Sequence, residues 1–177
     1  MQGKPVYVFE SRDGSQIRVF PAGHQDEAGL KALMERAAPE QRLTTSLSQT
    51  ATAPGVLVAG LLDGNAWVAI IGDDQLDETP VAVGRFLQMR EGEVEVAVVV
   101  RDDMQGRGIG SRMLYFVLDQ ARASGARKAV TTFESSNEAA WQVMQYSPYH
   151  MTWQPRGSQV DIVIHLQARA SVGTTLN

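Results

Sequence analysis

The sequence predicts an α+β domain, in which helices flank a mostly antiparallel sheet. Short runs rich in β-branched residues recur between residues 55 and 100, separated by glycine or acidic turns. After residue 105 the apolar residues change to helical spacing, and strand-like and helical segments then alternate up to residue 166. Short links between consecutive strands favour an antiparallel meander, and an amphipathic helix must bury its apolar face against such a sheet.

Each element follows from a local pattern. Alternating apolar residues bounded by turn residues predict strands at 6–9, 17–20, 56–59, 66–71, 81–89, 93–100, 129–133, 150–153 and 160–166. Apolar residues at helical spacing predict helices around 30–37, 109–121 and 137–145. The polar stretch 41–52 is either a short helix or a loop, because it has no clear period.

The chain is expected to form one folded domain. Its 177 residues match the usual size of a single domain. Residues 1–15 form an N-terminal leader or a short hairpin, because a β-type run ends at the turn sequence RDGS. Residues 16–167 form the domain itself, and 168–177 a flexible C-terminal tail.

Composition argues against several classes of function. The formal net charge of −4 offers no field to attract a nucleic acid. The chain has no cysteine, so disulfides, thiolate metal sites and a cysteine nucleophile are excluded. No apolar run reaches the length of a membrane helix, and the first residues lack a signal-peptide pattern. We therefore expect a cytoplasmic enzyme or binding module without a membrane or nucleic acid partner.

The most informative segment joins a strand, a glycine-rich loop and a helix. The strand Val94–Val100 is followed by Gln105-Gly106-Arg107-Gly108-Ile109-Gly110, and a helix begins there. Glycines allow close backbone approach, and the amide N–H groups at a helix N-terminus attract anions. The expected ligand is a phosphate or pyrophosphate, although the glycines could also serve only to make a tight turn.

Two common phosphate loops do not fit this segment. A nucleoside triphosphate loop ends in Gly-Lys-Ser/Thr, whereas Gly110 is followed by Ser111 and Arg112. A dinucleotide loop has the spacing G-x-G-x-x-G, whereas Gly106, Gly108 and Gly110 give G-x-G-x-G. Neither a kinase-like nor a Rossmann fold is therefore expected.

The loop resembles the acyl-CoA signature Q/R-x-x-G-x-G/A of the GNAT superfamily, with Gln105, Gly108 and Gly110 at the matching positions. The order of the predicted elements over residues 16–167 agrees with that family. The resemblance implies a GNAT fold, acetyl-CoA as co-substrate, an amine as acceptor and no metal. Acyl transfer would proceed by direct attack in a ternary complex, because no nucleophile suited to a covalent intermediate is evident.

The resemblance also implies which residues contact the cofactor. The strand before the loop would bind the pantetheine arm through its backbone, at Val98, Val99 and Val100. The pyrophosphate would lie over the loop, at Gln105, Gly106, Arg107, Gly108, Ile109, Gly110 and Ser111. Arg107 either adds charge to the phosphates or points to solvent. Asn137 matches an asparagine near the pantetheine, but a role as helix N-cap fits equally well.

Glu95 is the candidate general base, because it is an acid in a strand of valine and alanine. Desolvation raises the proton affinity of a carboxylate, which suits it to accept the proton of an ammonium. Alternatively, Glu95 lies on a solvated sheet face beside a partner such as Arg85. The segments SQIRVF, APEQRL and VEVAVVVRDDMQGRGIG resemble bacterial Pat-type protein lysine acetyltransferases, which implies the role of base for Glu95.

Other features leave the activity partly open. The family's usual tyrosine, seven residues after the asparagine, is Met144 here, and Tyr146 is displaced by two residues. The usual Gly-Phe at the end of the last helix is replaced by Pro148-Tyr149. The acceptor is a protein lysine or a small amine, and a homodimer is conceivable. A non-catalytic acyl-CoA-binding sensor or partner module is the alternative function.

Overall fold

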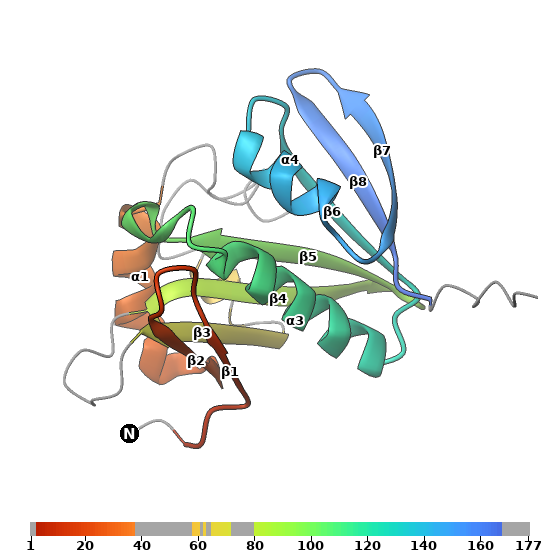
Figure 1. The fold of residues 1–177 in the computed structure, drawn as a ribbon. Helices are drawn as coiled ribbons and strands as arrows, with labels where there is room; N and C mark the ends of the chain where they lie inside the picture. Colours follow the sequence, from red (N-terminus) through yellow and green to blue (C-terminus); the bar gives the residue numbers. More distant parts are fainter. Residues whose placement is uncertain (1–2, 38–57, 61, 63–64, 72–79, 168–177) are drawn as a thin grey trace, which may run out of the picture.

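The computed structural model describes residues 3–37, 58–60, 62, 65–71 and 80–167. Its strands form one 8-stranded sheet in the order β1-β2-β3-β4-β5-β6-β8-β7, flanked by helices (Figure 1). The strands are β1 (Tyr7–Glu10), β2 (Gln16–Pro21), β3 (Asn65–Ile71), β4 (Pro80–Arg90), β5 (Glu93–Val100), β6 (Lys128–Glu134), β7 (His150–Arg156) and β8 (Gln159–His165). The helices are η1 (His24–Asp26), α1 (Glu27–Glu35), η3 (Asp102–Met104), α3 (Ile109–Ala123) and α4 (Glu138–Gln145).

Strand pairing confirms the predicted fold class. From β1 to β5 each strand pairs antiparallel with the next, which is the expected meander. β6 and β7 both pair antiparallel with β8. Among the described strands, only β5 and β6 run parallel, because α3 carries the chain back between them. The sheet is therefore mixed but mostly antiparallel.

The two faces of the sheet have separate apolar cores. Because side chains alternate along a strand, β4 and β5 supply residues to both. One core lies under α1 and includes Leu30, Leu33, Val83, Ala97 and Val99. The other lies under α3 and includes Ala82, Val100, Ile109 and Met113. The helices thus cover opposite faces of the central strands.

Helix α3 packs very closely on β4. A Cβ atom added to Gly84 of β4 would lie 2.8 Å from Cγ2 of Val117 and 3.4 Å from Cε of Met113. Atoms at the first distance overlap, so a glycine is needed there for the helix to lie this close to the sheet. This contact fixes the position of α3, and with it the glycine-rich loop at its N-terminus.

The sheet opens between β5 and β6. Their pairing covers only Glu93–Lys128, Val94–Ala129 and Glu95–Val130, after which the strands diverge. Helix α4 packs beside β6, where Trp141, Val143 and other apolar residues join the core formed with α3, β6 and β8. Figure 1 shows α4 and the β7–β8 hairpin together on the far side of this opening.

Some sequence predictions need correction or lie outside the described residues. Residues 58–60 are helical, so the strand predicted at 56–59 is wrong in the part that is described. The polar stretch 41–52, residues 56–57 and the C-terminal tail 168–177 are not among the described residues. In the N-terminal segment, β1 forms a hairpin with β2 and is the first strand of the main sheet.

Candidate active site

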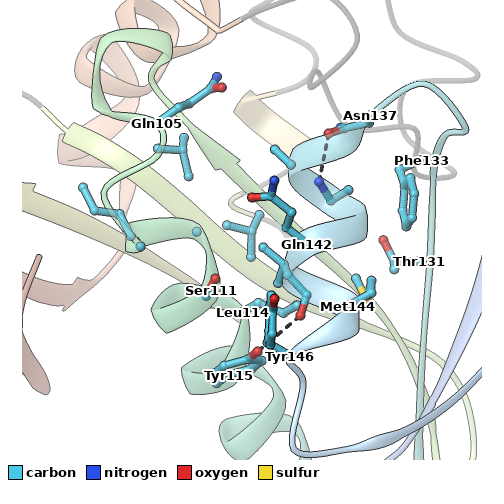
Figure 2. A pocket seen from close by; sticks show the side chains of 18 of the residues that line it. Gln105, Ser111, Leu114, Tyr115, Thr131, Phe133, Asn137, Gln142, Met144 and Tyr146 are labelled. Atoms are coloured by element: carbon cyan, nitrogen blue, oxygen red, sulfur yellow. Dashed lines mark hydrogen bonds between the residues drawn. The ribbon is translucent and has the colours of Figure 1, made fainter. Parts of the chain in front are cut away.

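A cavity of about 430 Å³ occupies the opening between β5 and β6. Its wall comes from β5, the loop after η3, the first turns of α3, the end of β6 and helix α4, with one residue from the β1–β2 turn. Figure 2 shows the side chains of α3 and α4 facing one another across it. The cavity therefore lies where the strand, loop and helix predicted to bind a phosphate meet.

The glycine-rich loop forms one end of the cavity. Gly106 and Gly108 have left-handed backbone conformations, with φ of 73° and 81°, which side chains disfavour. Gly108 is the N-cap of α3, so the next three N–H groups begin the helix without a carbonyl of an earlier turn to bind. The predicted residues that line the cavity here are Gln105, Gly106, Gly108, Ile109, Gly110 and Ser111.

Arg107 is not among the residues that line the cavity, and its side chain, 35% exposed, is held by hydrogen bonds to other parts of the chain. Its Nη1 lies 2.5 Å from Oδ2 of Asp13, and its Nη2 donates to the carbonyl of Asp103 at 3.1 Å. The guanidinium is thus held between the β1–β2 turn and η3. Asp13 also accepts from the hydroxyl of Ser11 at 2.6 Å. Hydrogen bonds from Ser11 and the Ser15 backbone, with Arg107, lower the pKa of Asp13 to about 2.

Arg12 lines the same end of the cavity and was missed by the sequence analysis. Its N–H donates to the carbonyl of Arg107 at 2.9 Å, and its Nη1 donates to the carbonyl of Gly106 at 3.3 Å. It is the one charged side chain among the described residues that line the cavity. Nothing near residue 12 in the sequence signals this contact, because it joins residues 94 positions apart.

The middle of the cavity follows the open edge of β5. Val96, Val98 and Val100 line it, and Thr131, Thr132 and Phe133 of β6 lie across the opening. Since β6 no longer pairs with this part of β5, backbone N–H and C=O groups of the strand face the opening. The side chain of Val99 lies instead in the core under α1, so only its backbone can meet a ligand here.

Glu95 is buried on the α1 side of the sheet, at the last pair before β5 and β6 diverge. Its side chain pairs with Arg85 across 3.5 Å, and the two side chains are 9% and 1% exposed. Arg85 was the partner named in the alternative hypothesis, but the pair is buried and not on a solvated face. Arg85 also donates from Nη1 to the carbonyl of Gly60 at 3.1 Å. Glu95 does not line the cavity itself, whereas Ala97, next on the same face of β5, does.

Asn137 is the N-cap of α4, as one of its two predicted roles requires, while its contact with the pantetheine arm stays a prediction. It lines the cavity, and its Oδ1 accepts a hydrogen bond from the N–H of Ala140 at 2.9 Å as the N-cap of α4 (Figure 2). The cap fixes the start of the helix that forms the far wall.

Three further side chains of chemical interest line the cavity near the end of α4 (Figure 2). Met144 occupies the position of the family's tyrosine, and Tyr146 is 77% exposed. Tyr115 of α3, which the sequence analysis did not single out, donates from its hydroxyl to the carbonyl of Val143 at 3.2 Å. Burial raises the pKa of Tyr115. Both tyrosines line the cavity, so a ligand bound there could contact either of them.

Within the described part of the chain, no group of three or more His, Cys, Asp or Glu side chains could hold a metal ion. None of the helices in that part is both long and apolar enough to span a bilayer.

Comparison with known proteins identifies the family. Residues 30–146 match the model of the acetyltransferase (GNAT) family. This match covers more than half of the chain, and the chain belongs to that family.

Curated relatives are acetyltransferases. The chain is 28% identical over 140 residues to acetyltransferase PA5475 of Pseudomonas aeruginosa. The match covers 75% of this chain and 74% of the relative. A shorter match, 43% identical over 49 residues, is to an L-methionine sulfoximine/L-methionine sulfone acetyltransferase of the same species and covers 28% of each chain. Together with the family, the relatives favour an enzyme over a non-catalytic binding module.

Solved structures show the same fold. The GNAT domain of PAT from S. lividans superposes with a TM-score of 0.73 at 22% identity, covering 90% of this chain and 96% of that domain. The yncA protein of Salmonella typhimurium, solved with its cofactor acetyl-CoA, gives 0.64 at 18% identity, covering 88% and 96%. The GNAT fold predicted from the sequence is thus confirmed. The family match and the curated relatives support an acyltransferase.

Proposed function

We propose that this enzyme transfers an acetyl group from acetyl-CoA to a primary amine, with Glu95 as general base. The observation that carries the proposal is the cavity itself. It runs from the glycine-rich loop, along the open edge of β5, to Ala97 on the face of the sheet that also holds Glu95. A cofactor with an anionic end and a long amide-containing arm fits such a path.

The residues that line the cavity support a position for each part of acetyl-CoA. The pyrophosphate would accept hydrogen bonds from the N–H groups at the start of α3, where the helix dipole adds positive potential. The arm would pair with the backbone of Val98, Val99 and Val100 as a strand does, because β6 has left that edge. Asn137 lies on the opposite wall. The thioester would then lie near the point where β5 and β6 meet.

The chemistry requires an unprotonated amine. The nitrogen attacks the thioester carbonyl carbon, the C–S bond breaks, and the amine loses a proton while the thiolate of CoA leaves. Glu95 is the carboxylate nearest to this point along β5, and it lies beside the last paired residues of the opening. The ion pair with Arg85 fixes the carboxylate in one position. No covalent enzyme intermediate is part of the proposal.

We propose a protein lysine as the acceptor, because SQIRVF at 15–20, which lies mostly in β2, and the glycine-loop segment resemble Pat-type enzymes. The third segment of that resemblance, APEQRL at 38–43, lies outside the described residues. The short match to an amino acid acetyltransferase favours a second candidate, the α-amine of a small amino acid. A panel of lysine-containing proteins, free amino acids, methionine sulfone and polyamines, assayed by thiol release from acetyl-CoA, separates the two.

The role of Glu95 is tested by Glu95→Gln, which keeps the shape and removes the basicity. Turnover near neutral pH should fall by about 10² to 10⁴, the usual contribution of a positioned base, and the acidic limb of the pH–rate profile should flatten. CoA affinity should change little. Glu93→Gln is the matched control, because Glu93 lies two residues earlier on the same strand and pairs with the exposed Arg90. Near-normal turnover of Glu95→Gln would remove Glu95 from the reaction.

The position of the cofactor is tested by Gly108→Glu. The substitution places a negative charge at the start of α3, and it forces a side chain into a left-handed conformation. Calorimetry with CoA should show no measurable binding, while circular dichroism shows a folded protein. Unchanged affinity in a folded variant would rule out the phosphate position at this loop.

A further inference from the structure

The N-terminal hairpin holds a cation over the phosphate end of the cavity. Arg12 lies in the turn between β1 and β2, and its side chain crosses the glycine-rich loop. A Cβ atom built on Gly108 would have Cγ and Nε of Arg12 as its nearest neighbours, both at 3.6 Å. The side chain therefore lies directly beside the residue that begins α3.

The backbone of the turn fixes this position. The N–H of Arg12 donates to the carbonyl of Arg107 at 2.9 Å, and Asp13 binds the Arg107 guanidinium at 2.5 Å. The turn itself is closed by the hydroxyl of Ser11, which donates to Asp13 at 2.6 Å, and by the N–H of Ser11, which donates to the carbonyl of Ser15 at 2.9 Å. Two contacts thus dock the hairpin on the loop without using the Arg12 side chain, whose own hydrogen bond to the Gly106 carbonyl occupies one of its donors.

Arg12 differs from Arg101 and Arg107 in lining the cavity and in having no carboxylate partner in the described contacts. Arg107 is paired with Asp13, and Arg101 forms two hydrogen bonds with the carboxylate of Asp103 at 2.6 and 3.0 Å. Among the described residues that line the cavity, Arg12 alone carries a charge. A guanidinium has five N–H donors, and the contact with the Gly106 carbonyl uses one of them.

We propose that Arg12 binds the pyrophosphate of acyl-CoA and that the N-terminal hairpin is part of the cofactor site. This inference rests on the proposed function, since it requires acyl-CoA in the cavity. The backbone N–H groups of α3 would bind one side of the pyrophosphate, and the Arg12 guanidinium would cover the other. Arg12 would thereby supply a positive charge of the kind that one of the two hypotheses gave to Arg107.

The test compares CoA and dephospho-CoA binding to Arg12→Ala by calorimetry. Affinity for both ligands should fall by about 5- to 30-fold, the scale of one partly exposed charge-assisted hydrogen bond. Because exposed charges are screened, the ratio of wild-type to variant affinity should shrink at high salt. Arg12→Lys should recover part of the loss, because it restores the charge but not the fork of donors.

Arg90→Gln is the matched control, since it removes one positive charge from an exposed side chain that does not line the cavity. Its affinities should equal those of the wild type, and the melting temperature of Arg12→Ala should be unchanged. Equal CoA affinity in the wild type and Arg12→Ala would overturn the inference and leave the proposed function intact. A loss confined to CoA would overturn the pyrophosphate assignment, because it would place Arg12 at the 3′-phosphate. A wild-type protein that binds neither ligand would overturn the proposed function and this inference together.

Discussion

The buried pair between Arg85 and Glu95 gives a quantitative prediction about stability. Arg85→Met removes a guanidinium that is 1% exposed and leaves the Glu95 carboxylate, 9% exposed, without it. Breaking a buried ion pair on one side costs about 3–5 kcal/mol, because the remaining charge has lost its partner away from water. A protein of this size loses about 2–4 °C in melting temperature per kcal/mol, so the expected fall is about 6–20 °C.

The double variant separates the ion pair from simple loss of packing. Arg85→Met/Glu95→Met fills the same space with apolar side chains, and it should regain stability to within about 1–2 kcal/mol of the wild type. Urea unfolding of the wild type, both single variants and the double variant gives the coupling energy. A coupling energy near zero, with the double variant as unstable as the sum of the singles, would refute the view that charge pairing matters here.

This cycle also bears on the catalytic test. Glu95→Gln keeps a hydrogen-bond acceptor beside Arg85 and should cost less than Arg85→Met, about 1–3 kcal/mol. Most of the protein should therefore remain folded at 25 °C. A turnover loss of 10² or more in a folded Glu95→Gln protein cannot then be explained by unfolding, so the kinetic result can be attributed to the carboxylate.

Two further predictions concern the frame around the cavity. Gly84→Ala should destabilise the protein by about 1–3 kcal/mol, since its Cβ would lie 2.8 Å from Cγ2 of Val117. Adding Val117→Ala should recover part of that loss in thermal unfolding, whereas purely additive losses would contradict the steric explanation. The pKa of Asp13 is lowered from 3.8 to about 2. The contribution of Asp13 to stability should be complete above pH 3.8 and disappear as the pH falls to about 2. An NMR titration of its carboxyl group with a normal midpoint would contradict the hydrogen bonds from Ser11 and Ser15 that lower this pKa.

Much of the fold could be predicted because its signals are local. The alternation of valines in β5, the glycines after it and the helical spacing that begins at Ile109 all lie within a few dozen residues. Each reflects the geometry of one element, so the strand, the loop and the helix could be assigned without knowledge of the rest. The prediction of a strand at 56–59 was wrong at 58–59 because it also used only local information. A short apolar run fits a strand and a buried helix equally well.

The sequence by itself determined the class of the sheet, the position of the glycine-rich loop between strand and helix, and all but one of the loop residues that line the cavity. Only the tertiary structure decided which charged side chains lie beside this loop and how they are paired. The pairing of Arg107 with Asp13 and the placement of Arg12 over Gly106 join segments 94 residues apart, and no local pattern encodes such a contact. The burial of Glu95 beside Arg85 joins two strands of the sheet in the same way. Backbone conformation is set by neighbours in the sequence, whereas desolvation and ion pairing are set by whatever the fold brings close in space.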